Sequence, residues 1–135
     1  MQNYIEGNVR TFVEAVAGAL DNKEGYLVEQ GAADNSVQLL GATVENAIGV
    51  MRQKLQAGEV DVSIRLLGKN GTVKVVAGGV IAQGDRVIGA NGGKVVKLPA
   101  GAGTYRVIGR KLTYGNSADN DVIEILDVVE TVIVP

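Results

Sequence analysis

Hydrophobic and polar residues alternate along much of the chain with a period of two, which is the pattern of β-strands that bury one face. The clearest run spans residues 60–66, where valine, isoleucine and leucine alternate with aspartate, serine and arginine. Shorter runs of the same kind lie at 26–29 and 37–40, separated by the turn-rich stretch 31–36, and another begins near 46–50. These patterns predict a series of short strands from residue 25 onwards.

Two asparagine–glycine pairs predict chain reversals between such runs. Asn70-Gly71 separates the strand at 60–66 from an apolar run at 73–76. Asn91-Gly92-Gly93 separates the runs at 86–88 and 95–98. Asparagine and glycine accept the positive φ angles that tight hairpin turns require. Each turn is therefore predicted to join its two flanking strands as an antiparallel hairpin.

Residues 1–24 fit two different structures. Their apolar residues follow one stripe of a helix, and these residues are Val9, Phe12, Val13, Val16, Ala17 and Leu20. The same stretch also tolerates an extended path, and Gly18 would weaken a helix interior by about 1 kcal/mol relative to alanine. We therefore expect a short helix or an extended arm over 1–24, ahead of a β-barrel-like domain at 25–135.

Two segments of the chain resemble each other. In 47–64, an apolar run ending at Gly49-Val50 is followed by a polar gap and then by a strand led by Glu59. In 107–125, an apolar run around Gly109 is followed by a polar gap and a strand led by Asn120-Asp121. Either an internal duplication or the recurrent strand-and-turn order of β-barrels explains this likeness.

The segment 121–135 is dense in valine and isoleucine on both faces of a strand. A strand that is apolar on both faces must be covered on both, and such a strand left exposed would aggregate. We therefore expect part of this segment to be covered by another subunit or by a partner protein. A soluble monomer that persists at high concentration would contradict this expectation.

Composition supports a β-protein with an aliphatic core. The 135 residues suffice for one domain, and 46% of them are hydrophobic but only 4% are aromatic. Valine, isoleucine, leucine and alanine must therefore form the core, while 19 glycines fit many tight turns. The expected fold class is mainly β, a small barrel or sandwich of short antiparallel strands and hairpins.

The composition also argues against several classes of function. The chain has no histidine and no cysteine, so it lacks the commonest general base, the best side-chain nucleophile and the usual zinc ligands; we expect no enzyme. Its 13 basic residues are scattered among 15 acidic ones, which disfavours nucleic-acid binding because that needs a basic stripe. No apolar run reaches the length of a membrane span. The start lacks a secretory pattern, and the absence of cysteine suits synthesis in the cytoplasm.

Three candidate chemical motifs have ordinary structural explanations. The glycine-rich stretch 78–85 could cradle a phosphate, but strand-like residues follow it where a helix is required. Asp119, Asp121 and Glu124 offer oxygen ligands for calcium without the spacing of an EF-hand. The serines have no histidine to activate them. We therefore expect turns at these positions, with no metal and no cofactor.

The run 75–87 also resembles lipoyl and biotinyl carrier domains, which present a modified lysine at a hairpin tip. The candidates would be Lys69 and Lys94, and neither has the residues that flank the modified lysine in those carriers. A carbohydrate-binding module is a further possibility, although sugar-binding faces usually stack sugars on exposed aromatic rings. A soluble binding module of either kind is the alternative function.

The order of motifs resembles the capsid cement, or head decoration, proteins of tailed bacteriophages. These motifs are Asn3-Tyr4-Ile5-Glu6-Gly7, Gly25-Tyr26-Leu27-Val28, Ala47-Ile48-Gly49-Val50, the strand at 58–64, the glycine-rich run at 78–87, Asn91-Gly92-Gly93-Lys94-Val95 and Val107-Ile108-Gly109. The resemblance covers most of the chain through turn-and-strand patterns. The chain departs from the family at Tyr105-Arg106 and in the apolar tail after Ile125.

The resemblance implies a structural protein of the virion, made in the host cytoplasm and added to the outer surface of the expanded head. Its partners would be the major capsid protein and further copies of itself, commonly as a homotrimer. A short apolar arm can add a strand to a sheet edge of the capsid protein; residues 1–16 are the first choice for this arm and 128–135 the second. The candidate contacts are Tyr4, Ile5, Val9, Phe12, Val128, Val132 and Ile133.

Overall fold

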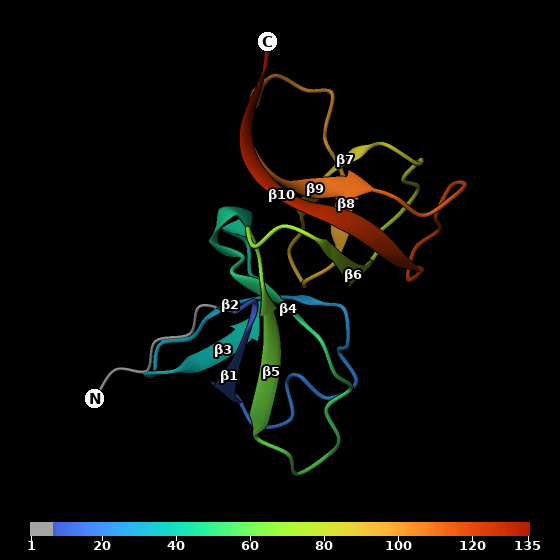
Figure 1. Cartoon of the computed structure of the whole chain (residues 1–135). Coiled ribbons are helices and arrows are strands. Elements are labelled where there is room, and N and C mark those ends of the chain that lie inside the picture. Colours follow the sequence, from blue (N-terminus) through green and yellow to red (C-terminus); the bar gives the residue numbers. More distant parts are fainter. Residues whose placement is uncertain (1–6) are drawn as a thin grey trace.

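The computed structural model describes residues 7–135, and its first half is a closed five-stranded barrel (Figure 1). The strands are β1 (Val9–Glu14), β2 (Leu27–Gln30), β3 (Ser36–Leu39), β4 (Gly49–Met51) and β5 (Asp61–Leu66). A 3-10 turn, η1 (Val44–Asn46), precedes β4. The strand order is β1-β3-β2-β4-β5, and β5 pairs with β1 to close the barrel.

The second half is a five-stranded sheet. Its strands are β6 (Thr72–Val76), β7 (Arg86–Gly89), β8 (Val95–Lys97), β9 (Gly103–Lys111) and β10 (Val122–Val134). They follow the order β6-β10-β9-β7-β8, and a parallel bridge between Ala77 and Val95 brings the end of β6 beside β8. The predicted fold class, a mainly β barrel or sandwich of short strands, is confirmed.

One of the two predicted hairpins forms and the other does not. β7 and β8 pair around Asn91-Gly92-Gly93 as expected. Asn70 and Gly71 also adopt the predicted positive φ, but β5 and β6 do not pair with each other. β5 is paired on both edges within the barrel, whereas β6 pairs with β10. The hairpin prediction over 60–76 is wrong because the turn reverses the chain without deciding which strand each neighbour joins.

The described part of the N-terminal segment follows the extended alternative. Residues 9–14 form β1, which pairs with β5 over Val9–Val13 and with β3 at Val13 and Glu14. The helix alternative is wrong for these residues, because alternate residues of β1 face the barrel interior and the opposite face lies outside. β1 is thus a wall of the first barrel and not a separate arm.

The two halves have the same topology. When β1 to β5 are matched in order with β6 to β10, every strand pairing in the first half has a counterpart in the second. Both contain one parallel contact, between the first and third strands, and four antiparallel ones. The likeness between 47–64 and 107–125 is therefore structural: these segments are the antiparallel pairs β4–β5 and β9–β10.

Individual backbone hydrogen bonds repeat as well. The Gly25 N–H donates to the Met51 carbonyl at 2.7 Å, and Gly25 has a φ of 85°. In the second half, the Gly84 N–H donates to the Lys111 carbonyl at 2.8 Å, and Gly84 has a φ of 87°. Each half therefore begins its second strand from the same left-handed glycine turn.

The parallel contact repeats in the same detail. The Ala15 N–H donates to the Val37 carbonyl at 2.9 Å, just after β1. Its counterpart, the Gly78 N–H, donates to the Val95 carbonyl at 2.7 Å, just after β6. The parallel contact between the first and third strands is therefore built in the same way in each half.

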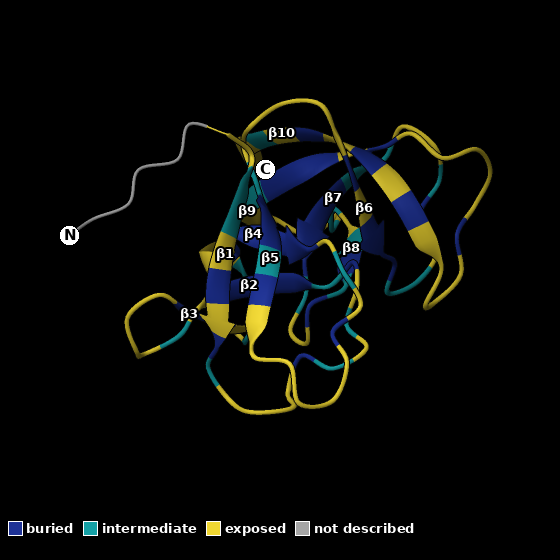
Figure 2. Ribbon diagram, turned by 60° about the horizontal axis from the view of Figure 1, so that its bottom comes forward, coloured by how far each residue is buried: buried dark blue, intermediate teal, exposed yellow. Residues whose placement is uncertain are grey.

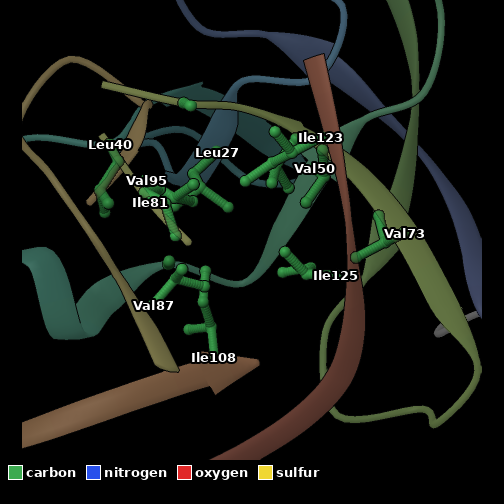
Figure 3. Close-up of a cluster of buried hydrophobic side chains, with 13 residues drawn as sticks. Leu27, Leu40, Val50, Val73, Ile81, Val87, Val95, Ile108, Ile123 and Ile125 are labelled. Carbon is green, nitrogen blue, oxygen red and sulfur yellow. The ribbon is translucent and has the colours of Figure 1, made fainter. Parts of the chain in front are cut away.

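Buried side chains fill one core inside the first barrel and a second core that both halves share. The barrel core contains Phe12, Leu20, Val28, Val37, Met51, Leu55, Val62 and Ile64. The shared core takes Leu27, Leu40, Ala47 and Val50 from the first half and nine residues from the second, with Ile81, Ile108, Ile123 and Ile125 the largest (Figure 3). Adjacent residues of β2 thus serve different cores, since Val28 points into the barrel and Leu27 into the shared core.

Candidate interaction surface

The longest strands of the molecule project beyond the repeated unit as a two-stranded ribbon. We call residues 103–107 of β9 together with 128–134 of β10 the C-terminal ribbon. Its antiparallel register pairs Val132 with Tyr105 and Ile133 with Thr104. In Figure 1 the ribbon carries the C-terminus to the top of the view, away from the first barrel. The corresponding strands of the first half, β4 and β5, have no such extension.

Both outer edges of the ribbon lack a backbone partner among residues 7–135. β6 pairs with β10 as far as Leu126, and the Asp127 N–H donates to the Gly71 carbonyl at 2.8 Å. Beyond that point, the described backbone partners of β10 belong to β9. On the other side, the pairing of β7 with β9 reaches only Val107. The ribbon therefore presents unpaired N–H and C=O groups on two sides.

A bulge at the root of the ribbon changes which side chains of β10 are covered. Before it, Ile123, Ile125 and Asp127 are buried and alternate with exposed residues, as the banding of β10 in Figure 2 shows. The register then shifts between Asp127 and Glu130, where β10 carries one residue more than β9. After the bulge no side chain is fully buried: Val128 is 42% and Ile133 73% exposed. The β10 strand of the ribbon is therefore rich in apolar side chains that are at most partly covered.

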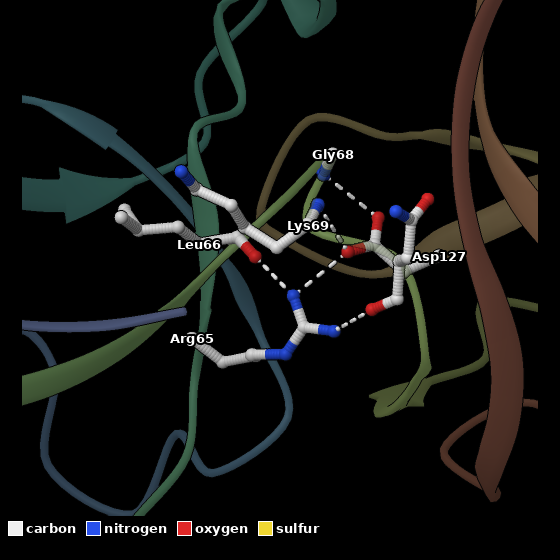
Figure 4. Close-up of polar contacts among 6 residues, drawn as sticks. Arg65, Leu66, Gly68, Lys69 and Asp127 are labelled. Atoms are coloured by element: carbon white, nitrogen blue, oxygen red, sulfur yellow. Dashed lines mark hydrogen bonds and ion pairs between the residues drawn. The ribbon is translucent and has the colours of Figure 1, made fainter. Parts of the chain in front are cut away.

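A buried polar cluster anchors the root of the ribbon to the first barrel (Figure 4). Arg65 of β5 donates from its guanidinium to the Asp127 carboxylate at 2.7 Å, and the side chain of Asp127 is 0% exposed. The carboxylate also accepts the backbone N–H groups of Gly68 at 2.8 Å and Lys69 at 3.0 Å. Arg65 donates in turn to the carbonyls of Leu66 and Asn70.

This cluster compensates the cost of burying two charges. Taking an ion pair out of water costs several kcal/mol per ion, so the pair is tolerated only when further hydrogen bonds satisfy its remaining groups. Asp127 has three donors and Arg65 has three acceptors here. Because the partners lie on β5, β10 and the connection 67–71, the cluster fixes the direction in which β10 leaves the shared core.

Two further contacts hold the ribbon against the body of the protein. Arg106 donates to the carbonyls of Glu45 at 3.1 Å and Ala47 at 2.7 Å. Glu130 lies 3.7 Å from the Nε of Arg86. Both charged side chains of the ribbon therefore have partners in the same chain, which leaves apolar groups and free backbone edges as its exposed features.

The sequence-predicted contact residues fall into three groups. Tyr4 and Ile5 lie outside the described residues. Phe12 is 5% exposed inside the barrel, and Val9 is half-buried on β1, so β1 offers little free apolar surface. Val128, Val132 and Ile133 all lie in the C-terminal ribbon. The structure therefore brings together the second-choice segment, 128–135, as an exposed surface.

A groove of about 450 Å³ separates the first barrel from β6 and β10. Its walls include Val9 and Arg52 from the barrel and Lys74 and Val122 from the second half. The lining mixes both charges with apolar side chains. No cluster of three or more potential metal-ligating side chains exists here or elsewhere in the part of the chain that the structure describes.

The candidate chemical motifs serve local structure. Asp121 accepts the Ala118 N–H at 2.8 Å, and Asp119 lies 3.1 Å from the Lys94 ammonium. In the glycine-rich stretch, Asp85 accepts the Ala82 N–H at 2.9 Å, and the strand β7 follows. Asp85 and Asp121 therefore stabilise turns, and Asp119 forms an ion pair.

No protein-family model matches the chain, and no characterised protein matches it in sequence. Within residues 7–135, no helix has the length and apolar character needed to cross a membrane.

Sequence reasoning missed the Arg65–Asp127 cluster and the free edges of the ribbon. A signal for the first was present, because Asp127 continues the alternation of Ile123 and Ile125 on one face of the predicted strand, whereas Glu124 and Glu130 fall on the opposite face. A buried strand accepts such a residue only with a paired charge. The free edges depend on where β6 and β7 end, which the local pattern does not specify.

Proposed function

We propose that this chain is a non-enzymatic structural protein of a tailed-bacteriophage head, which binds the outside of the major capsid protein lattice and stabilises the expanded shell. The resemblance of its motifs to capsid cement proteins suggests the class. The C-terminal ribbon supports the self-association that this class implies, since a surface of backbone edges and aliphatic side chains suits strand addition between proteins.

Attachment to the capsid is assigned to the N-terminal residues. The Asn8 carbonyl accepts the Leu66 N–H at 2.8 Å, so the barrel begins to hold the chain from that residue. Of the proposed arm 1–16, the barrel therefore uses the residues from Asn8 onwards, and 1–7 remain the candidate for attachment. Many copies, each bound weakly, would then stabilise a shell through multivalency.

The alternative, a soluble carrier or carbohydrate-binding module, has less support. A carrier lysine must swing freely at a hairpin tip. The Lys94 ammonium is paired with Asp119, and the backbone beside it packs against the first barrel, where the Gly93 carbonyl accepts the Leu27 N–H at 2.7 Å. The Lys69 N–H donates to the buried Asp127, so its turn is fixed as well.

Sedimentation with purified tailed-phage heads that lack their decoration protein tests the proposal. We expect binding to expanded heads and none to unexpanded heads. A variant that lacks residues 1–6 should bind expanded heads at least tenfold more weakly, while Tyr114→Ser, a change at a side chain that is 90% exposed on the connection between β9 and β10, should bind normally. Binding to neither form of head would overturn the proposed function.

A further inference from the structure

We propose that copies of this chain associate edge to edge through the C-terminal ribbon, with residues 128–134 of one copy pairing antiparallel with residues 103–106 of the next. This inference deepens the self-association in the proposed function by naming its surface and geometry. It does not require that the assembly bind a capsid.

The backbone provides the first argument. Among residues 7–135, β10 has no backbone partner on one side after Asp127, and β9 has none on the opposite side before Val107. Natural proteins protect exposed edges with charges, proline or bulges. Residues 128–134 contain one charged residue, Glu130, and residues 103–106 contain one, Arg106. The bulge lies at the root of the ribbon, and the register beyond it is continuous from Glu130 to Val134.

The presence of two bare edges favours a second copy as the partner. A foreign strand that pairs with β10 would leave the edge of β9 open. Head-to-tail association covers both edges in every copy with one kind of contact, and such a contact gives a closed ring when its rotation closes. β9 and β10 are antiparallel to each other within one copy. In a ring whose axis runs along the strands, β10 of each copy is therefore also antiparallel to β9 of the next copy.

The side chains agree with an uncharged partner strand. Ile133 and Val128 are exposed, whereas Arg106 and Glu130 already have partners within their own chain. The ribbon therefore offers no unpaired charge to attract an oppositely charged protein. A further copy presents the same apolar surface. The ring contains three or more copies, because two ribbons provide only four strands to close a barrel.

The first test measures molar mass by sedimentation equilibrium. The wild-type chain should have at least three times the mass of one 14.0 kDa chain. Ile133→Lys places a charge on the proposed contact and should return the mass to that of one chain. The matched control is Val80→Lys, at a residue that is 69% exposed on the connection between β6 and β7, and it should keep the wild-type mass. A monomeric wild type, or an Ile133→Lys variant that stays assembled, would overturn the inference.

The second test distinguishes the head-to-tail contact from a symmetric one. Since the chain has no cysteine, Thr131→Cys on β10 and Thr104→Cys on β9 introduce single reactive sites. Head-to-tail pairing predicts that a short bismaleimide joins copies when the two variants are co-expressed, and much less when either is alone. Crosslinking of Thr131→Cys alone would show instead that two β10 edges meet, and crosslinking of Thr104→Cys alone that two β9 edges meet. Either result would overturn the proposed geometry.

Failure of this inference can be told apart from failure of the proposed function. A monomer that binds expanded heads contradicts the ribbon contact and leaves the capsid role standing. An assembled ring that binds no heads contradicts the capsid role and leaves the ribbon contact standing.

Discussion

The two halves of this protein share one topology and differ in how they end. In both, the last two strands pair antiparallel, with Gly49 opposite Leu66 in the first half and Gly109 opposite Asp127 in the second. After Leu66 the chain leaves the barrel for the connection at 67–71. After Asp127 the strand continues for seven more residues as the C-terminal ribbon. The extension is therefore not needed to complete the repeated unit, which is why we assign it to association.

The difference at Leu66 and Asp127 also shows how the halves are joined. A partly buried leucine stands where the second half has a fully buried aspartate, and that aspartate binds Arg65, the neighbour of the leucine. Asp127 is thus joined to the residue that precedes its own counterpart in the first half. Substitutions at equivalent positions can show which features belong to the shared unit and which to one half.

The largest effect is expected from Asp127→Ala. The substitution leaves the Arg65 guanidinium buried without its carboxylate, which costs about 3–5 kcal/mol of unfolding free energy, as measured by urea denaturation. The control, Asp119→Ala, breaks an exposed ion pair and should cost less than about 1 kcal/mol. Replacing both members, with Arg65→Met and Asp127→Leu, should recover only part of the loss, because the Gly68 and Lys69 N–H groups still lack their acceptor. Equal stability of the Asp127→Ala and Asp119→Ala proteins would show that the cluster does not join the halves.

A second prediction concerns the paired glycines Gly49 and Gly109. A Cβ at Gly109 would collide with the Leu126 carbonyl, and one at Gly49 would lie 2.7 Å from the Arg65 carbonyl. Each alanine substitution should therefore push two paired strands apart and lower the unfolding free energy by about 1–3 kcal/mol or more. Gly101→Ala, whose new Cβ would meet its nearest neighbour at 3.9 Å, serves as the control. A tolerated change in one half alone would show that the close strand approach is not common to both.

Local sequence pattern predicted the strands of both halves better than their partners. The alternation at 60–66 and the turn at Asn91-Gly92-Gly93 led to a correct strand and a correct hairpin. The same reasoning failed at Asn70-Gly71, because the pairing of β6 with β10 is decided by a shared core whose residues are distant in sequence. The ambiguity over residues 9–14 arose because Val9, Phe12 and Val13 satisfy a helical spacing, and only the pairing with β5 decides against it.

The candidate surface was predictable in part. Apolar residues on both faces of 121–135 indicated a strand that needs cover, and Val128, Val132 and Ile133 lie on the exposed ribbon. Phe12 was misjudged, since its apolar character serves the barrel core. The repeat was visible in sequence only around Gly49 and Gly109, because the other equivalences lie in backbone hydrogen bonds that many different side chains allow.

A third prediction compares the glycine turns that begin the second strand of each half. Gly84→Ala forces alanine into a left-handed conformation and should lower the unfolding free energy by about 1–2 kcal/mol. The packing adds nothing to this cost, since the new Cβ would meet no atom within 4 Å. Gly25→Ala has the same backbone strain and also places the Cβ 3.1 Å from a methyl group of Val76. It should therefore be the more destabilising of the two in thermal unfolding. Adding Val76→Ala should remove part of this excess, and an equal cost at both positions would contradict the packing difference.

The smallest effect is expected at Glu130, whose partner Arg86 belongs to the repeated unit while Glu130 itself does not. Their charged groups lie 3.7 Å apart and both side chains are substantially exposed. Glu130→Ala should lower the unfolding free energy by only about 0.2–1 kcal/mol, measured on monomeric protein. The difference from wild type should shrink as salt is raised, because exposed charge pairs are screened. A loss as large as that of Asp127→Ala would mean that the ribbon is part of the folding unit after all, and the contrast between the two halves would then lie in stability and not in association.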